Sequence, residues 1–501
     1  MHALRYLILL VPSLLSAQAE TRSAAAVTTI SSQDIMERIA AVAHDSMLGR
    51  NNPSPGLEQT ARYVASEFRR LGLRPAGEQG GYFQRFELSR WTVDSMRSSV
   101  TLERPGSRQV LKVGAEVRYV DGAIPPAALR GPVVLMAGSL EPGNDVRDRI
   151  ALVVVDYTKT LPPSLGPDIY RLAGSGVRAV LLLSNRDSVT FAERLRTAAQ
   201  PRLQREAARD QDSIAPILEV HERSLGALLA GLELQPARLR RSSGPTRITL
   251  PQLNAVIRLS RNTQSRANLP NVIGILEGSD STLRHEFVAY SAHIDHIGLS
   301  PGQRDSINNG ADDNASGVAG LLELAEAFSQ PGARPRRSLL FLAPSAEEPG
   351  LLGSAHFTDH PTVPLQSIVA DINMDLIGRN WPDSVIAVGL EQSDLGATLA
   401  EVVRAHPELR MTPIPDRWPE EQIFYRSDHY NFARKGVPIL FFTSGTHSDY
   451  HRPSDEPSRI NPEKESRLVQ LLFYLGESVA NRSQRPRWSA ESYRQIVERK
   501  K

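Results

Sequence analysis

The sequence predicts an α/β protein: a mixed, largely parallel sheet flanked by helices, with an inserted small α/β domain. After residue 251, apolar β-rich runs alternate with segments whose apolar residues recur at helical spacing, a pattern typical of parallel sheets. Between residues 108 and 250 the β-rich runs are shorter, and no group of ionisable residues gathers near them. These two observations indicate a main domain interrupted by a smaller module.

Composition limits the class of protein. A chain of 501 residues with 41% hydrophobic and 23% charged residues is long enough for more than one domain. Its 58 basic and 56 acidic residues give a net charge of +2, and the arginines are scattered, so we expect no nucleic-acid partner. Because the sequence contains no cysteine, any metal ion would be held by histidine and carboxylate side chains.

The N-terminus has the pattern of a signal peptide. Arg5 precedes an apolar stretch, and the small-x-small motif Ala17-Gln18-Ala19 follows it. We therefore expect cleavage after Ala19 and export to the periplasm or the medium. A stable membrane anchor would need about 20 continuous apolar residues, and Pro12 interrupts this shorter run.

The elements predicted before the insert are two helices and two short strands. The helices are expected at residues 32–47 and 57–73, separated by a turn rich in Asn, Pro and Gly, and the strands at 82–88 and 98–104. The expected domains are a signal peptide (1–19), an N-terminal part of the main domain (20–107), the insert (108–250), the rest of the main domain (251–485) and a polar tail (486–501).

The main domain is expected to contain buried strands joined by helices. A helix is predicted at 318–330 and another at 395–406. The predicted strand segments are "NVIGILEG", "EFVAYSAHIDHIG", "RRSLLFLAPSAEE", "SIVADINMDLIG" and "VPILFFTSG". In largely parallel sheets, ligands bind at the carboxyl ends of strands, so the residues that follow these runs are candidates for function.

Histidines and carboxylates follow these strands. Taken one at a time, each has an ordinary structural explanation, such as a hydrogen-bonded histidine at a strand end or a helix cap. The residues concerned are His293, Asp295 and His296; Asp312 and Asp313; Glu347 and Glu348; Asp375; and His447, Asp449, His451 and Asp455.

Together these residues predict a metal site. Several like charges at one sheet edge would be unfavourable, because a buried unpaired charge costs several kcal/mol. Divalent cations remove this cost, and a ligand set of nitrogen and oxygen without sulfur favours zinc over manganese or cobalt. One of the two adjacent residues Asp312 and Asp313 would bridge two ions through its two oxygens, and the other would fix the turn.

The motifs resemble, in order, those of the co-catalytic dizinc exopeptidases, the family of secreted bacterial aminopeptidases and glutamate carboxypeptidase. The resemblance extends to "SMLGRNNPSPG" and "YFQRF" near the start, and the insert resembles a protease-associated domain. The motifs that carry it are "HIDHIG", "NNGADDNASG", "SAEEPGLLGSAHF", "NMDLIG", "SDHYNFARKGVP" and "YHRPSD".

The resemblance implies two Zn²⁺ ions per chain and a role for each residue. Asp312 is the implied bridging carboxylate, with a strained peptide bond between Asp312 and Asp313, and Glu347 is the implied general base. Asp295 is expected to orient a ligating imidazole. The further implied ligands are His293 and Asp375 for one ion and Glu348 and His451 for the other. Supporting or substrate-contacting roles fall to Asp313, Tyr425, Ser427, Asp428, His429 and His296.

The implied function is an exported dizinc aminopeptidase that acts on peptide substrates. The same scaffold also serves carboxypeptidases, dipeptidases and a single-zinc glutaminyl cyclase, and some relatives are binding proteins without catalysis. The complete ligand set argues against the cyclase and against loss of catalysis. The choice between amino- and carboxypeptidase, the side-chain preference and the oligomeric state stay open at this point.

Overall fold

A computed structural model describes residues 25–162, 164–205, 214–241, 244–300, 302 and 304–498. The predicted signal peptide, residues 1–19, lies outside these residues. The chain divides into two compact units: the first contains the residues up to Phe86 and those from Asn268 onward, and the second contains Glu87–Ala267. None of the helices in the described ranges is long and apolar enough to cross a membrane.

The sheet of the first unit is mixed, and its centre is parallel. Strands β14, β13, β15 and β18 lie side by side and run parallel, whereas β12 and β16 flank them in antiparallel orientation. Along the sheet the order is β17 (Thr412–Ile414), β16 (Ser384–Val388), β18 (Ile439–Thr443), β15 (Ile368–Met374), β13 (Phe287–Ser291), β14 (Ser338–Ala343), β12 (Arg261–Leu276) and β2 (Phe83–Val93). The short β1 (Arg74–Pro75) pairs with β12.

Helices cover both faces of this sheet, as the alternation of side chains in β13 shows. Ala289 packs with Phe357 and Phe432, which belong to α9 (Leu352–Asp359) and α11 (His429–Ala433). The next residue, Tyr290, points to the opposite face, where its ring lies 6.1 Å from that of Phe328 and its hydroxyl donates to Leu472 O at 2.9 Å. A strand buried on both faces explains why β13 contains no charged residue.

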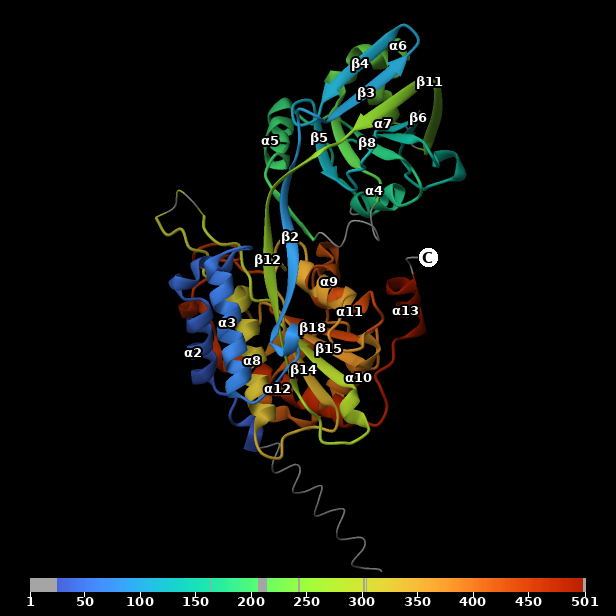
Figure 1. Ribbon diagram of the computed structural model, residues 1–501. Helices are drawn as coiled ribbons and strands as arrows, with labels where there is room; N and C mark the ends of the chain where they lie inside the picture. Colours follow the sequence, from blue (N-terminus) through green and yellow to red (C-terminus); the bar gives the residue numbers. More distant parts are fainter. Residues whose placement is uncertain are drawn as a thin grey trace, which may run out of the picture. The chain divides into compact units, whose positions relative to one another are not determined.

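The helices on the face that Tyr290 contacts are α8 (Gly317–Ser329) and α12 (Pro462–Asn481), and α2 (Ser32–Val42) packs on both (Figure 1). The stacked rings of Phe328 and Phe473, with centroids 4.2 Å apart, join α8 to α12. Helix α12 begins after the cap Asn461, whose side chain accepts from Lys464 N, with Pro462 in the first turn. The remaining long helices of the unit are α3 (Pro55–Arg70) and α10 (Leu395–Ala405), and the short α13 (Ala490–Ile496) lies near the C-terminus.

The second unit has its own sheet and core. Its parallel strands β6, β7, β8 and β10 are continued by antiparallel β11 and β5, and the two apolar clusters of the unit include Leu135 and Val134 on opposite faces of β6. The strands are β3 (Ser99–Arg104), β4 (Ser107–Lys112), β5 (Val117–Asp121), β6 (Leu129–Ala137), β7 (Ile150–Val154), β8 (Ala179–Ser184), β10 (Ile217–His221) and β11 (Thr246–Arg258). The helices are α4 (Leu165–Ala173), α5 (Ser188–Ala198), α6 (Gly226–Gly231) and α7 (Pro236–Arg241).

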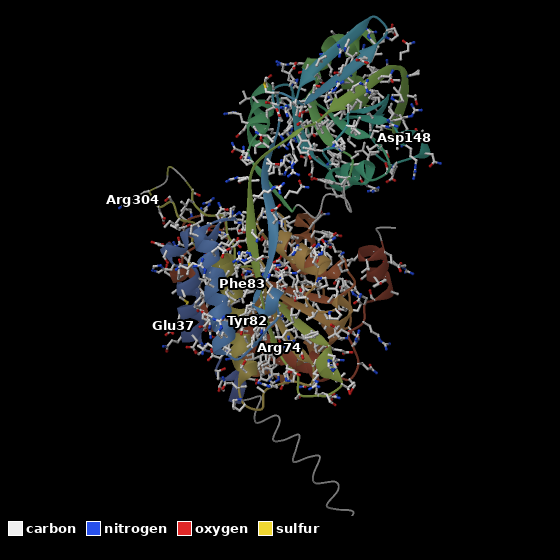
Figure 2. All side chains as sticks on the ribbon, in the orientation of Figure 1. Glu37, Arg74, Tyr82, Phe83, Asp148 and Arg304 are labelled. Carbon is white, nitrogen blue, oxygen red and sulfur yellow. The ribbon has the colours of Figure 1, made fainter. Side chains whose placement is uncertain are left out.

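The boundaries of the second unit lie outside the predicted insert of 108–250. Strand β3, which the sequence placed before the insert, pairs with β11 from Ser99↔Arg258 to Glu103↔Asn254 and therefore belongs to the second sheet. Strand β9 (Arg202–Arg205) pairs with Leu88–Trp91 of β2 in the same unit. Glu219 is buried there between Arg118 and Arg186, at 2.7 and 3.2 Å, an ion-pair cluster that the sequence pattern did not reveal. Figure 2 shows the side chains on both units.

Candidate metal centre

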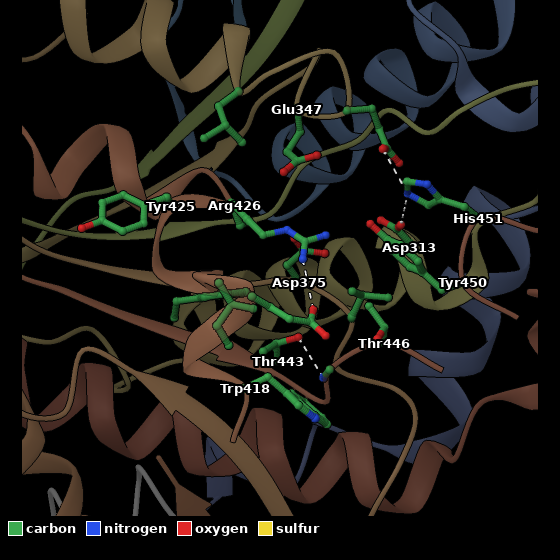
Figure 3. A pocket seen from close by; sticks show the side chains of 18 of the residues that line it. Asp313, Glu347, Asp375, Trp418, Tyr425, Arg426, Thr443, Thr446, Tyr450 and His451 are labelled. Atoms are coloured by element: carbon green, nitrogen blue, oxygen red, sulfur yellow. Dashed lines mark hydrogen bonds and ion pairs between the residues drawn. The ribbon is translucent and has the colours of Figure 1, made fainter. Parts of the chain in front are cut away.

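The predicted site residues follow the carboxyl ends of the four parallel strands. His293 lies two residues after β13, Asp375 directly follows β15, and His451 lies in the loop after β18. Glu347 and Glu348 come from the loop after β14, and Asp313 lies at the entry to α8. Parallel strands bring these loops to one edge, where Figure 3 shows Asp313, Glu347, Asp375 and His451 around one cavity.

Two groups of potential ligand atoms share Asp313. In the first group, His293 Nε2 lies 3.3 Å from Asp375 Oδ1 and 3.5 Å from Asp313 Oδ1. In the second, His451 Nε2 lies 3.1 Å from Asp313 Oδ2 and 3.2 Å from Glu348 Oε2. Each oxygen of Asp313 therefore faces a different group, which is the geometry of a carboxylate that bridges two ions.

Asp313 occupies the place that the sequence analysis gave to Asp312, so that expectation is wrong by one residue. The carboxylate of Asp312 points elsewhere: Oδ1 accepts from Gly378 N at 2.6 Å, and Oδ2 lies 3.2 Å from His447 Nε2. The cis peptide bond of this loop joins Asp313 to Asn314, not Asp312 to Asp313. The backbone N–H groups of Asp312 and Asp313 both donate to the carboxylate of Asp455, and these hydrogen bonds stabilise the loop.

His296 is a fourth member of the second group. Its Nδ1 lies 2.8 Å from Glu348 Oε1 and 3.8 Å from Asp313 Oδ2, and the side chain is fully buried. The two oxygens of Glu348 are thus divided, one facing His296 and the other facing His451. The sequence analysis gave His296 only a supporting role. Its position three residues after His293 was the signal that could have identified it as a candidate ligand.

Asp295 contacts the imidazole that it is expected to orient, and three further groups. Its carboxylate accepts from the N–H groups of Glu347 and Glu348 at 3.1 and 3.3 Å and from Asn52 Nδ2 at 2.5 Å. The ring Nδ1 of His293 is 3.7 Å from that carboxylate and 3.2 Å from the backbone O of Asp295. Asp295 therefore fixes the Glu347–Glu348 turn and lies beside the imidazole of His293.

Glu347 belongs to neither ligand group. It lines a cavity of about 390 Å³, together with apolar side chains that include Leu376, Trp418, Ile423 and Phe441. Burial raises the pKa of Glu347 well above its usual value, and the negative charges of Asp375 and Glu348 add to this effect. A carboxyl group with a raised pKa beside a substrate-sized cavity is typical of a group that exchanges protons.

The residues of the "YRSDH" motif surround the site without entering the ligand groups. Ser427 Oγ donates to Asn373 Oδ1 at 3.2 Å, and burial raises the pKa of Asp428 to about 7. His429 Nε2 contacts Phe424 O at 2.8 Å, and burial lowers its pKa to about 3. Tyr425 is 46% exposed and lines the cavity.

The ligand groups fit divalent ions. Ligand atoms about 2.0–2.1 Å from a tetrahedral zinc ion lie about 3.3–3.4 Å from one another, and the contacts of His293 and His451 span 3.1–3.5 Å. Burial lowers the pKa of an imidazole, but Asp313 and Glu348 raise that of His451 to about 10, so a positive charge is favoured here. A nitrogen and oxygen donor set suits zinc, which would supply this charge without a proton.

Comparisons with known proteins find similarity to peptidases. Residues 271–475 match the profile described as Peptidase family M28. The aminopeptidase YwaD of Bacillus subtilis is 34% identical over 133 residues, 26% of this chain and 26% of that protein. Aminopeptidase NAALADL1 of Mus musculus is 40% identical over 111 residues, 21% of this chain and 13% of that protein. The chain thus matches 26% and 13% of the lengths of these two curated relatives.

A solved structure shares the fold over most of the chain. The aminopeptidase from Aneurinibacillus sp. strain AM-1 superposes with a TM-score of 0.51 and 18% identity, covering 92% of this chain and 96% of that one. At this identity the likeness concerns the fold. It confirms the α/β class with a mixed sheet flanked by helices.

Proposed function

We propose that this chain is an exported zinc-dependent aminopeptidase that binds two zinc ions, and the match of residues 271–475 to the profile described as Peptidase family M28 supports this proposal. The observation that carries the proposal is the arrangement of two ligand groups that share Asp313, beside the unligated carboxyl of Glu347 in a cavity. Export is supported by the Ala17-Gln18-Ala19 motif after an apolar stretch. The similarity of the chain to named aminopeptidases supports the same activity.

The proposed ligands divide between the two ions. His293 and Asp375 would hold one ion, His451 and Glu348 would hold the other, and Asp313, which both groups share, would serve both. Bound zinc ions supply Lewis acidity, lowering the pKa of a water from 15.7 to about 7 and stabilising the negative oxygen that forms on the substrate carbonyl. Asp295 keeps the backbone of Glu347 and Glu348 in place through its two carboxylate oxygens.

Glu347 performs the proton transfers. The carboxyl group accepts a proton from the attacking water and returns it to the departing amine, and its raised pKa makes it a stronger base than an exposed carboxylate. The site is rich in carboxylates, which favours a positively charged α-amine at the end of a peptide. The apolar wall of the cavity, formed by Trp418, Ile423 and Phe441, accommodates the side chain of the terminal residue.

One observation favours a second candidate, a carboxypeptidase or dipeptidase. Arg426 lines the same cavity, where its Nη1 pairs with Glu421 Oε2 at 3.2 Å (Figure 3). A guanidinium group forms bidentate hydrogen bonds with carboxylates, so Arg426 is suited to bind the free C-terminus of a peptide. The end of the peptide that is cleaved therefore has to be measured.

The purified protein is expected to release residues from peptides with a free N-terminus, and N-acetylated peptides are expected to resist. Dialysis against a chelator should abolish release, and added zinc should restore it, because the ligands in the site are neutral imidazoles and carboxylates that bind the ion reversibly. Chromatography of the products measures both effects. Equal cleavage of the N-acetylated peptides from their C-termini would favour the carboxypeptidase.

We also propose that the second unit is an inserted protease-associated domain with no part in metal binding, since every candidate ligand lies in the first unit. A variant in which an Asn-Gly turn replaces residues 87–267 is expected to bind as much zinc as the whole chain. The cut ends lie close together, because Arg85 Nη1 donates to Asn268 O at 3.2 Å. Metal analysis of the folded variant checks this, and a variant that folds without binding zinc would contradict the assignment.

A further inference from the structure

The segment Gly49–Asn52, here called the GRNN segment, has no place in the proposed mechanism and yet is buried beside the metal groups. It includes the last two residues of η1 (Asp45–Arg50) and lies far in sequence from the other site loops. The side chain of Arg50 is 1% exposed and that of Asn52 5% exposed. A buried arginine is rarely retained unless its charge or its hydrogen bonds are needed.

Arg50 uses all five of its N–H donors on backbone carbonyls of two loops and of the last residue of α2. Its contacts are Nε to Ile294 O at 3.0 Å, Nη1 to Val42 O at 3.1 Å and Asn309 O at 2.5 Å, and Nη2 to Gly310 O at 3.0 Å and Asp313 O at 3.3 Å. Ile294 lies between His293 and Asp295, and Asp313 is the shared ligand. One guanidinium therefore ties the loop of the first histidine to the loop of the bridging carboxylate.

The backbone of the GRNN segment is joined to the same loops. Arg50 O accepts from His296 N at 3.2 Å, and Gly49 O accepts from Gly298 N at 2.9 Å. Gly49 has φ +65°, and a Cβ there would lie 2.5 Å from Gly298 O and 2.6 Å from Asn308 O, so only glycine permits this approach. Arg50 itself has φ +51°, a left-handed conformation that is unfavourable for a residue with a side chain.

Asn52 connects the segment to the remaining catalytic loop. Its Nδ2 donates to Asp295 Oδ2 at 2.5 Å, and its Oδ1 accepts from Ala346 N at 3.1 Å. Asp295 in turn accepts from the N–H groups of Glu347 and Glu348. The side chain of Asn52 thus contacts the residue before the proposed base directly and the N–H of the base through Asp295.

We propose that the GRNN segment positions the metal centre: Arg50 sets the distance between the His293 and Asp313 loops, and Asn52 sets the Glu347–Glu348 turn through Asp295. Arg50 and Asn52 are positioning residues, since neither faces the cavity. The inference rests on the proposed function for its activity measurements, while its metal measurements stand alone. A lysine at position 50 keeps the charge but has three donors in place of five and no planar fork.

The test compares Arg50→Lys with Arg337→Lys in the full chain. Arg337 is a matched control, because it is 0% exposed and donates to backbone carbonyls, among them Val479 O at 3.1 Å and Ser483 O at 3.3 Å, but immediately precedes β14, at the opposite end of the strand from the site. Zinc affinity is measured by competition with a chromophoric chelator, and the ligand field by the absorption spectrum of the Co²⁺-substituted protein. Thermal unfolding measures the stability of each variant.

Arg50→Lys is expected to weaken zinc binding by about tenfold or more, as loss of an outer contact to a metal site does, and to change the Co²⁺ spectrum. Arg337→Lys is expected to lose stability alone. The proposal is overturned if the two variants agree in zinc affinity and Co²⁺ spectrum. If the wild-type protein binds zinc but releases no terminal residue, the proposed function fails while this comparison stays valid.

Asn52→Ala keeps the proposal testable should Arg50→Lys not fold. This variant leaves the Arg50 contacts in place but loosens the turn that carries both the ligand Glu348 and the base Glu347, so its kinetics are measured at a zinc concentration that saturates the site. Because the turn that carries Glu347 loses one support, kcat is expected to fall by about tenfold or more with KM unchanged. An unchanged kcat in a folded, zinc-loaded Asn52→Ala protein would refute the role of the segment.

Discussion

Glu347→Gln is expected to keep both zinc ions and to lose about 10²–10⁴ in kcat, the usual contribution of a positioned general base. The glutamine keeps the shape of the side chain but cannot accept a proton. Glu347 lies outside both ligand groups and lines the cavity, so its removal leaves the ligand atoms unchanged. Steady-state kinetics beside metal analysis of the same preparation measures the two effects.

Glu348→Gln is the matched control, because it makes the same change one residue away. Glu348 Oε2 lies 3.2 Å from His451 Nε2. Burial alone would raise the pKa of Glu348, but its contacts with His296 and His451 outweigh burial and lower this pKa well below the usual value. This variant is expected to lose zinc as well as activity, since an anionic ligand becomes a neutral amide. A Glu347→Gln protein depleted of zinc, with a zinc-replete Glu348→Gln protein, would mean that the two roles are exchanged.

Asp313→Asn is expected to lose zinc and to lower kcat/KM by on the order of 10²-fold or more, because an amide has one ligating oxygen and cannot bridge two ions. The two oxygens of Asp313 face His293 Nε2 at 3.5 Å and His451 Nε2 at 3.1 Å. Both ion positions therefore depend on this carboxylate. Zinc stoichiometry and kinetics on the purified variant give the result.

Asp312→Asn is the control for Asp313→Asn. It shows whether loss of zinc comes from loss of the bridging carboxylate of Asp313 or from any substitution in this loop. Asp312 Oδ1 accepts from Gly378 N, and an amide oxygen accepts the same hydrogen bond. The variant is therefore expected to keep its zinc and most of its activity while losing some stability. Loss of zinc in Asp312→Asn, with normal zinc in Asp313→Asn, would restore the assignment made from the sequence.

The sequence by itself determined the fold class and the family resemblance, and both are confirmed. Local patterns carry this information. Continuous apolar runs gave the buried strands, including Phe287–Ser291 and Ser338–Ala343, and helical spacing gave Gly317–Ser329 within one residue at each end. Because adjacent parallel strands end at one edge, the position of a histidine or carboxylate just after such a run predicted which loops would meet.

Tertiary structure alone decided which atoms meet within those loops. Asp312 and Asp313 are adjacent residues with the same side chain. The backbone conformation of one turn determines that Asp313 faces the histidines and Asp312 faces Gly378. The partners of Asp295 and the contacts of Arg50 join segments some 50 to 260 residues apart, and no local periodicity encodes them. Periodicity reports which face of a strand or helix is buried, whereas loop dihedral angles and long-range hydrogen bonds are fixed only when the elements pack together.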